Sequence, residues 1–141
     1  MGFRSLRDCV GALRTEGECV VIDHPVDPHL EIAEIQRRLF RAGGPAVLFT
    51  HPRGTAFPVL VNLYGTHKRI ERIFADTFDR VRRLVELKID PTAALRNPAR
   101  YWRSPFDALA MLPRSVRSGP VMAHSVPLSA VPQVVSWPGD G

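Results

Sequence analysis

Two short apolar runs near the middle of the chain constrain its fold more than any other feature. They are "AVLFT" at residues 46–50 and "PVLVNLY" at residues 58–64, separated by a segment that contains Pro52 and Gly54. Both are β-rich and of strand length, so they predict a strand pair or neighbouring strands of one sheet. Because the runs are almost continuously apolar, both faces of that sheet should be covered, which predicts helices on each side.

Residues 5–16 are predicted to form a helix that precedes this sheet, because apolar residues recur there at three- and four-residue steps. Ser5 followed by Asp8 is a variant of the capping box, and Gly17 is placed to end the helix. The β-branched run "CVVID" at residues 19–23 then predicts a strand.

A second helix is predicted between that strand and the two apolar runs. Asp27 is a suitable N-cap, Pro28 suits the first helical position, and the helix should continue to about Ala42. Gly43 stands where a left-handed residue ends a helix, and Pro45 prevents continuation. A phosphate cradle needs glycines before a helix, so a glycine pair that follows one does not predict phosphate binding.

The chain after Gly65 is predicted to form two more helices. Thr66 caps the first, which bears Ile70 and Ile73, and a further helix carries Phe78 and Val81 and ends near Asp90.

Residues 91–119 contain four prolines and have little periodicity, so we expect a connector. It should hold only a short helix at residues 106–112 and should pack through Tyr101, Trp102 and Phe106.

The last segment, residues 120–141, is extended and apolar and predicts one or two strands followed by a turn. A chain that finishes on "WPGDG" directly after a strand would leave an unpaired apolar edge near Val134 and Val135, which complete domains avoid. We therefore expect that the sequence is truncated or that a partner covers this edge.

Composition places the chain among ordinary globular proteins, with 45% hydrophobic and 23% charged residues. No apolar run approaches the length of a membrane helix, and the N-terminus is charged, so we expect a cytoplasmic protein without an integral membrane segment. The net charge of +5 includes the basic block "RVRR" at residues 80–83, but acidic residues lie close to it and no aromatic residues are interleaved. We therefore predict a solvated helix face rather than nucleic-acid binding.

No catalytic, cofactor-binding or metal-binding residue can be assigned from local patterns. His24, His29, His51, His67 and His124 form no HxH or HExxH motif, and the looser spacing in "HPVDPH" crosses a proline turn. Turn and cap roles are the expected ones.

Two acidic residues and two cysteines were further candidates for chemistry. Glu31 and Glu34 share a helix face, but nearby arginines favour ordinary ion pairs over paired-carboxylate catalysis. Cys9 and Cys19 lack a CxxC motif or a second pair and should be buried and reduced.

Three motifs in a fixed order nevertheless resemble a known family. They are "VDPHLE" from residue 26, "RAGGPA" from residue 41 and "WPGD" from residue 137. Together with residues 1–75 and 120–141, they are similar to the N-terminal part of the UbiD decarboxylases, of the 3-octaprenyl-4-hydroxybenzoate carboxy-lyase type, whereas residues 76–119 match loosely.

This resemblance implies a reversible, non-oxidative decarboxylase of aromatic or α,β-unsaturated carboxylic acids. The implied cofactor is prenylated FMN with manganese and potassium, and the complete protein would be a homo-oligomer. The family's flavin contacts, metal ligands and catalytic residues lie beyond the "WPGD" segment, so none is transferred to this chain, which alone should be inactive.

The predicted fold is α/β (α+β): a small mixed sheet flanked by helices, followed by the first strand or strands of an incomplete flavin-binding split barrel. The predicted domains are residues 1–90, a connector at 91–119, and the start of the flavin-binding domain at 120–141. Two alternatives stay open: a non-catalytic interaction subunit that docks through the strand edge near Val134 and Val135, and a basic nucleic-acid binder.

Overall fold

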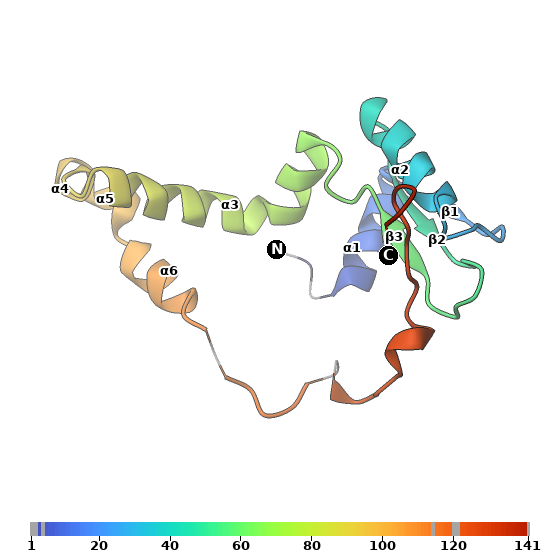
Figure 1. Ribbon diagram of the computed structural model, residues 1–141. Coiled ribbons are helices and arrows are strands. Elements are labelled where there is room, and N and C mark those ends of the chain that lie inside the picture. Colours follow the sequence, from blue (N-terminus) through green and yellow to red (C-terminus); the bar gives the residue numbers. More distant parts are fainter. Residues whose placement is uncertain (1–2, 4, 114, 120–121, 141) are drawn as a thin grey trace. The chain divides into compact units, whose positions relative to one another are not determined.

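The computed structural model describes residues 3, 5–113, 115–119 and 122–140, apart from the side chain of residue 76 (Figure 1). The chain divides into two compact units, one formed by residues 3–73 and 124–140 and the other by residues 74–123. This division follows spatial proximity and does not test the predicted three-part domain organisation, which remains a prediction.

Helix α1 (Leu6–Thr15) has the predicted signals at both ends. The hydroxyl of Ser5 accepts a hydrogen bond from the Asp8 amide at 3.1 Å, as an N-cap does. Gly17 has a φ of 73°, and the amides of Gly17 and Glu18 donate to the carbonyls of Arg14 and Leu13. These two bonds form a Schellman motif, so the predicted end of the helix is confirmed.

Three strands form the predicted mixed sheet, in the order β1 (Cys19–Ile22), β2 (Ala46–Phe49) and β3 (Val59–Val61). Strand β1 runs parallel to β2, with Cys19 opposite Ala46, whereas β3 pairs with β2 in the antiparallel direction. Strand β3 covers only part of the apolar run predicted at residues 58–64.

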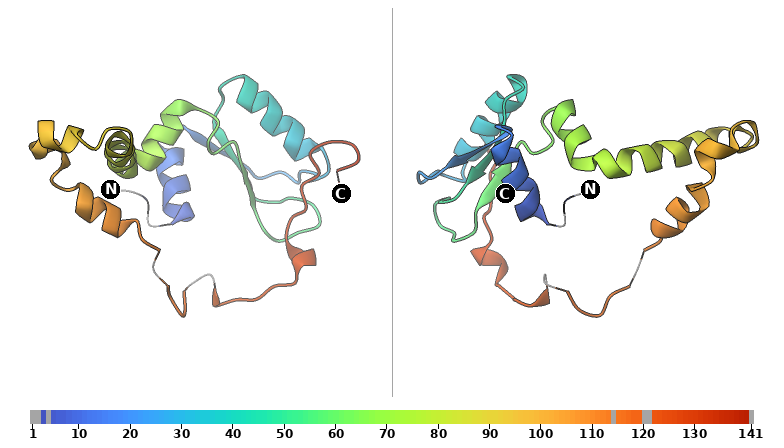
Figure 2. Two further views of the ribbon diagram at one scale, coloured as in Figure 1. Left: turned by 60° about the vertical axis from the view of Figure 1, so that its left-hand side comes forward. Right: turned by 180° about the vertical axis from the view of Figure 1, so that it is seen from behind.

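Both faces of this sheet are covered, as the continuous apolarity of the runs predicted (Figures 1 and 2). Helix α2 (Glu31–Arg41) covers one face, and α1 covers the other. Two hydrophobic clusters form the core, one on each face. The cluster under α2 comprises Val26, Ile32, Val47, Phe49 and Val61. The cluster under α1 comprises Cys9, Leu13, Cys19 and Ala46, with Ile73 packed against it. The buried residues of these two clusters are thereby removed from water.

The predicted start of α2 is wrong. The helix begins at Glu31, and Asp27 is not its N-cap, because the Asp27 carboxylate instead accepts the amide of His29 at 2.8 Å. Pro28 likewise lies outside the helix. Leu30 has a φ of 68° and lies at the centre of a γ-turn closed by the bond from the Glu31 amide to the His29 carbonyl. Residues 26–30 remain extended because they pair with other segments: Val26 with Pro52, and His29 with Val135.

The end of α2 agrees with the prediction. Gly43 has a φ of 61°, and its amide donates to the Phe40 carbonyl. The amide of Gly44 donates to the Leu39 carbonyl at 2.8 Å, which completes a second Schellman motif. The glycine pair therefore ends a helix and leads the chain directly into β2.

Residues 67–89 form one continuous helix, α3 (His67–Ile89), so the prediction of two separate helices is wrong. Thr66 is nevertheless the predicted cap, because its hydroxyl accepts the amide of Arg69 at 3.3 Å. No residue between the two predicted segments breaks the helix, since both apolar stripes follow the same helical period.

The supposed connector is largely helical. It contains α4 (Ala93–Arg96), α5 (Pro98–Tyr101) and α6 (Ser104–Ala110). Tyr101 is buried, as predicted, but Trp102 and Phe106 are 62% and 66% exposed, so their predicted packing role is wrong. These helices are short, and α5 and α6 have a proline in the first turn, which explains why no longer periodicity is visible in the sequence.

The predicted strands after residue 120 are absent from the described part of this segment, which contains a 3₁₀ turn, η2 (Leu128–Ala130). Val135 forms a single parallel bridge with His29 instead. The edge near Val135 is therefore paired within the chain, contrary to the prediction of an uncovered edge. The flavin-binding split barrel remains a proposal.

Candidate functional site

Arg69 is the most deeply buried charged side chain that the structure describes, with 1% of its surface exposed. Its Nε donates to the Leu63 carbonyl at 3.3 Å, and one terminal nitrogen donates to the Asn62 carbonyl at 3.1 Å. The other terminal nitrogen lies 3.2 Å from Oε2 of Glu18. Since each nitrogen of the guanidinium has a partner, burial of this charge is compensated.

Asn62 connects this arginine to the glycine pair that ends α2. Its amide nitrogen donates to the carbonyls of Gly44 and Pro45 at 3.1 and 3.0 Å. Its φ of 57° belongs to the left-handed region, which asparagine tolerates better than most residues. Gly65 leaves space for the same side chain, because a Cβ on Gly65 would lie 1.9 Å from Oδ1 of Asn62.

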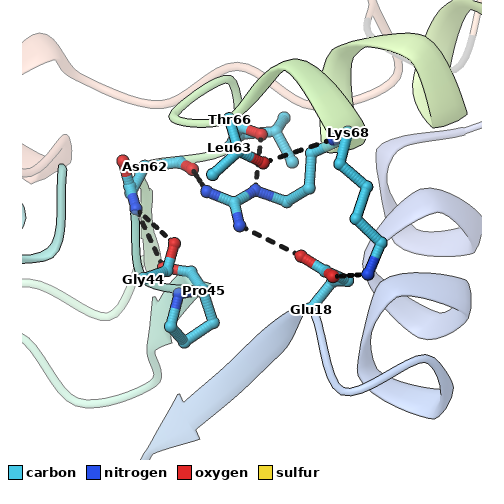
Figure 3. A network of polar contacts seen from close by, with 8 residues as sticks. Glu18, Gly44, Pro45, Asn62, Leu63, Thr66 and Lys68 are labelled. Carbon is cyan, nitrogen blue, oxygen red and sulfur yellow. Dashed lines mark hydrogen bonds and ion pairs between the residues drawn. The ribbon is translucent and has the colours of Figure 1, made fainter. Parts of the chain in front are cut away.

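This buried network is suited to structural rather than chemical work. Hydrogen bonds from Lys68 and Arg69 lower the pKa of Glu18, so the carboxylate stays ionised opposite its two cations. The network joins the start of β1, the start of β2, the end of β3 and the start of α3 (Figure 3). This network was not identified from the sequence. Asn62 and Gly65, three positions apart, are a local turn signal, but they do not reveal the buried arginine.

The five histidines do not come together as a metal site. All five are exposed, and the residues that the structure describes contain no group of three or more His, Cys, Asp or Glu side chains able to hold a metal ion. His29, in the "HPVDPH" segment, bridges to Val135 through its backbone. The expectation of turn roles for this segment agrees with that geometry.

Glu34 forms ion pairs, as its spacing from the arginines predicted. Its carboxylate accepts Nε of Arg37 at 2.6 Å and Nε of Arg38 at 2.7 Å. These contacts, that of Arg37 first, lower the pKa of Glu34 to about 2. Glu31 does not face it as a catalytic partner, because its Oε2 accepts the Asp27 amide at 2.7 Å.

Cys9 and Cys19 are free thiols buried in the cluster between α1 and the sheet. Burial raises the pKa of both thiols, which keeps them protonated and unreactive. The predicted burial of both cysteines is confirmed.

An exposed cluster of Asp23, Thr50 and His51 was not anticipated from the sequence. The Thr50 hydroxyl donates to Oδ1 of Asp23 at 2.7 Å, and Nδ1 of His51 lies 2.7 Å from the same oxygen. Thr50 first and His51 second hold the pKa of Asp23 below its usual value. Because Thr50 and Asp23 both face Nδ1, the cluster lacks the relay through opposite ring nitrogens that a catalytic triad uses.

The basic block at residues 80–83 is a helix face with acidic partners, in agreement with the prediction. Arg83 lies 3.0 Å from Asp107, and Arg82 lies 3.2 Å from Glu86. The sequence had indicated acidic neighbours, but Asp107 comes from α6 and could not be paired with Arg83 by local spacing.

The "VDPHLE" segment pairs with Val135, which lies just before the "WPGD" motif in the sequence. In the "VDPHLE" segment, the Pro28 carbonyl accepts the Val135 amide at 3.1 Å, and the Leu30 amide donates to the Val135 carbonyl at 3.0 Å. Just beyond, the Asp140 carboxylate of "WPGD" accepts the Ser136 amide at 2.9 Å. The left panel of Figure 2 shows this returning segment in red beside the start of α2. We call the pairing of residues 28–30 with Val135 the clasp.

Comparison with curated proteins finds long relatives. The chain is 40% identical over 141 residues to an uncharacterized protein of Chlamydia trachomatis serovar D and 39% identical over 143 residues to one of Chlamydia muridarum. Each alignment covers 97% of this chain but 24% of the relative. The chain therefore spans about a quarter of the length of these relatives.

Among solved structures, the UbiD-class enzyme HmfF from Pelotomaculum thermopropionicum, in complex with FMN, is 28% identical with a TM-score of 0.44. That alignment covers 48% of this chain and 15% of HmfF. An evolved dimeric form of HmfF in complex with prFMN is 23% identical with a TM-score of 0.49, over 58% of this chain and 20% of that one.

A family model decides the relationship. The model of the 3-octaprenyl-4-hydroxybenzoate carboxy-lyase N-terminal domain matches residues 10–88, which include the second half of α1, the whole sheet, α2 and most of α3. This span is more than half of the chain and contains the buried Arg69 network. The chain therefore belongs to the UbiD family, and residues 10–88 match the family's N-terminal domain.

Proposed function

We propose that this chain is the N-terminal part of a prenylated-FMN-dependent, non-oxidative decarboxylase that acts on aromatic or α,β-unsaturated carboxylic acids. The observation that carries the proposal is the family match over residues 10–88. Its supporting feature is the clasp, in which Leu30 of the "VDPHLE" motif pairs with Val135, just before the "WPGD" motif. A cytoplasmic location, a role in quinone or aromatic-acid metabolism and homo-oligomerisation belong to the same proposal.

The described residues do not fit a metal site for the manganese that accompanies this cofactor. They contain no group of three or more metal-ligating side chains, and the two described cysteines are buried as protonated thiols. We therefore assign no cofactor contact and no catalytic step to this chain, and propose that the flavin, manganese and potassium are held by other parts of the enzyme. None of the helices in the described ranges is both long and apolar enough to cross a membrane.

The proposed contribution of this chain is structural: it orients the polypeptide that leads to the flavin-binding domain. The Arg69 network fixes the ends of the strands, and the clasp fixes residues 28–30 to Val135. In cofactor enzymes, the protein contributes by orienting reactive groups, and a rigid supporting element improves that orientation. We propose that the clasp sets the direction in which the polypeptide enters the flavin-binding domain.

The test is to express the longest reading frame that contains this sequence, reconstitute it with prenylated FMN and measure carbon dioxide release from a panel of aryl and acrylic acids. The expected result is release by the long product and none by residues 1–141 alone. A long product that binds prenylated flavin but releases no carbon dioxide from any acid in the panel would contradict the proposed reaction.

The alternative of a non-catalytic interaction subunit needs a different contact surface from the one first predicted. Val135 is already paired through both of its backbone groups, so strand addition at that position is blocked in this fold. What favours an interaction role is an apolar face on α3, where Phe78 and Val85 are about half exposed.

A further inference from the structure

An apolar groove of about 460 Å³ runs along one face of α3, within the unit formed by residues 74–123. Its centre is formed by Phe78, Val81 and Val85, which are 51%, 43% and 49% exposed. Its remaining lining residues are Phe74, Thr77, Arg82 and Glu86. Soluble proteins rarely leave contiguous apolar surfaces of this kind uncovered unless a partner uses them.

The spacing of the apolar residues indicates the shape of that partner. Phe74, Phe78, Val81 and Val85 follow one another at steps of four, three and four residues. This is the repeat of the a and d positions in a coiled coil, in which each side chain packs between four side chains of a facing helix. The groove is therefore shaped for an amphipathic helix.

The charge around the groove indicates the partner's chemistry. Nine of the nineteen basic residues and five of the fourteen acidic residues lie between positions 74 and 123, so this unit carries +4 of the chain's net charge of +5. Glu86, on the groove wall, is already held by Arg82, Arg100 and the Tyr101 hydroxyl at 3.2, 3.0 and 2.9 Å. The side chain of Arg82 is 67% exposed, and its guanidinium has more N–H donors than its contact with Glu86 uses.

Two other occupants fit this surface less well. A second copy would bring together two units of like charge, with Arg82 on both sides of the contact, and this repulsion opposes association. A nucleic acid would satisfy the arginines but would leave Phe78, Val81 and Val85 facing its charged backbone. We propose that the groove binds an amphipathic helix of a partner protein, with its apolar stripe against these three residues and acidic side chains beside Arg82.

The experiment uses residues 1–141 and three synthetic peptides of about 21 residues, which is three heptads. The first has leucine at positions a and d and glutamate at e and g; the second replaces the glutamates by lysine; the third keeps the first composition in scrambled order. Binding is measured by fluorescence anisotropy. We expect the acidic amphipathic peptide to bind at least about tenfold more tightly than either of the others, with affinity that falls as salt rises.

Matched variants separate the two contributions. Phe78→Ser should weaken binding of the acidic peptide about tenfold or more, whereas Phe78→Leu, which keeps the side chain apolar, should largely retain it. Arg82→Glu should reverse the preference between the glutamate and lysine peptides. Leu95, which is 85% exposed on α4 and does not line the groove, provides the control variant Leu95→Ser, for which no change is expected. Circular dichroism of each variant verifies that α3 is retained.

Several outcomes would overturn the proposal. Equal binding of the acidic and basic peptides would contradict the proposed role of charge. Equal binding by folded Phe78→Ser and by the unchanged protein would show that the groove is not the binding site. Sedimentation that reveals a dimer lost in Phe78→Ser would assign the face to a second copy. Heparin or DNA binding that depends on Phe78 as well as Arg82 would assign it to a polyanion. None of these outcomes depends on decarboxylase activity.

Discussion

The amide of Leu30 donates to the carbonyl of Val135 at 3.0 Å, and this bond holds the start of α2 against the end of the described chain. The reciprocal bond runs from the Val135 amide to the Pro28 carbonyl at 3.1 Å. Neither residue belongs to a regular strand, so the two bonds of the clasp are isolated from the sheet.

Val135→Pro should open the clasp, because proline has no amide to donate to the Pro28 carbonyl. We expect faster hydrogen exchange at the Leu30 amide and no change at the Ala46 amide, which donates to the Glu18 carbonyl within the sheet region. Val135→Ala keeps the amide and serves as the control. Unchanged exchange at Leu30 in the proline variant would mean that the clasp does not protect this bond in solution.

Leu30→Gly should be more stable than Leu30→Ala, the reverse of the usual order. Both variants lose the leucine side chain, but only glycine adopts a φ of 68° without steric cost. The expected difference in the free energy of unfolding is about 1–3 kcal/mol, measured by urea titration. A more stable alanine variant would show that the γ-turn at residue 30 is relaxed in solution.

Gly65→Ala should destabilise the chain, because the added Cβ would lie 1.9 Å from Oδ1 of Asn62. To avoid it, Asn62 must give up its bonds to Gly44 and Pro45, at a cost of about 1–3 kcal/mol. The control is Gly11→Ala in α1, where a Cβ meets nothing within 4 Å. That change should stabilise the helix by about 0.5–1 kcal/mol, and equal effects of the two substitutions would contradict this account.

Arg69→Leu should be severely destabilising, by about 3–5 kcal/mol, because it leaves Glu18 and the Asn62 carbonyl without their buried cation. Lys68→Ala removes the other cation on Glu18, but Lys68 is 78% exposed, so only a small loss is expected. Urea unfolding of both variants measures the contrast. Similar losses would show that Arg69 has no special role.

Acid should weaken the fold partly through Glu34. Its pKa falls from 4.5 to about 2 in the folded chain, so its ion pairs contribute fully above pH 4.5 and are lost as the pH falls towards 2. In Glu34→Gln, the fall in stability between these pH values should be smaller, as it should in high salt, because the pair is partly exposed. The measurement is thermal unfolding at a series of pH values, and identical pH profiles would contradict it.

Local signals were sufficient to predict the parts of the fold that depend on near neighbours. Ser5, Gly17 and Gly43 marked helix ends correctly, because a cap involves residues within one turn. The three strands and the covered faces of the sheet followed from apolar runs of strand length.

The errors occurred where distant segments decide the local structure. Asp27 has every property of an N-cap, but the clasp and the bridge from Val26 to Pro52 keep that segment extended. Arg69 could not be recognised as buried from the sequence, because its anionic partner, Glu18, lies 51 positions away. The absence of a strand around Val135 has the same origin, since a single bridge leaves no periodic pattern to read.

The clasp can form only late in synthesis of the chain. Residue 30 leaves the ribosome long before residue 135, while strands β1 to β3 and their helices lie within the first 73 residues and depend on contacts of shorter range. Contacts that are close in sequence form faster, and growing chains fold from the N-terminus. The sheet can therefore assemble during translation, and closure of the clasp would report that synthesis has passed residue 135.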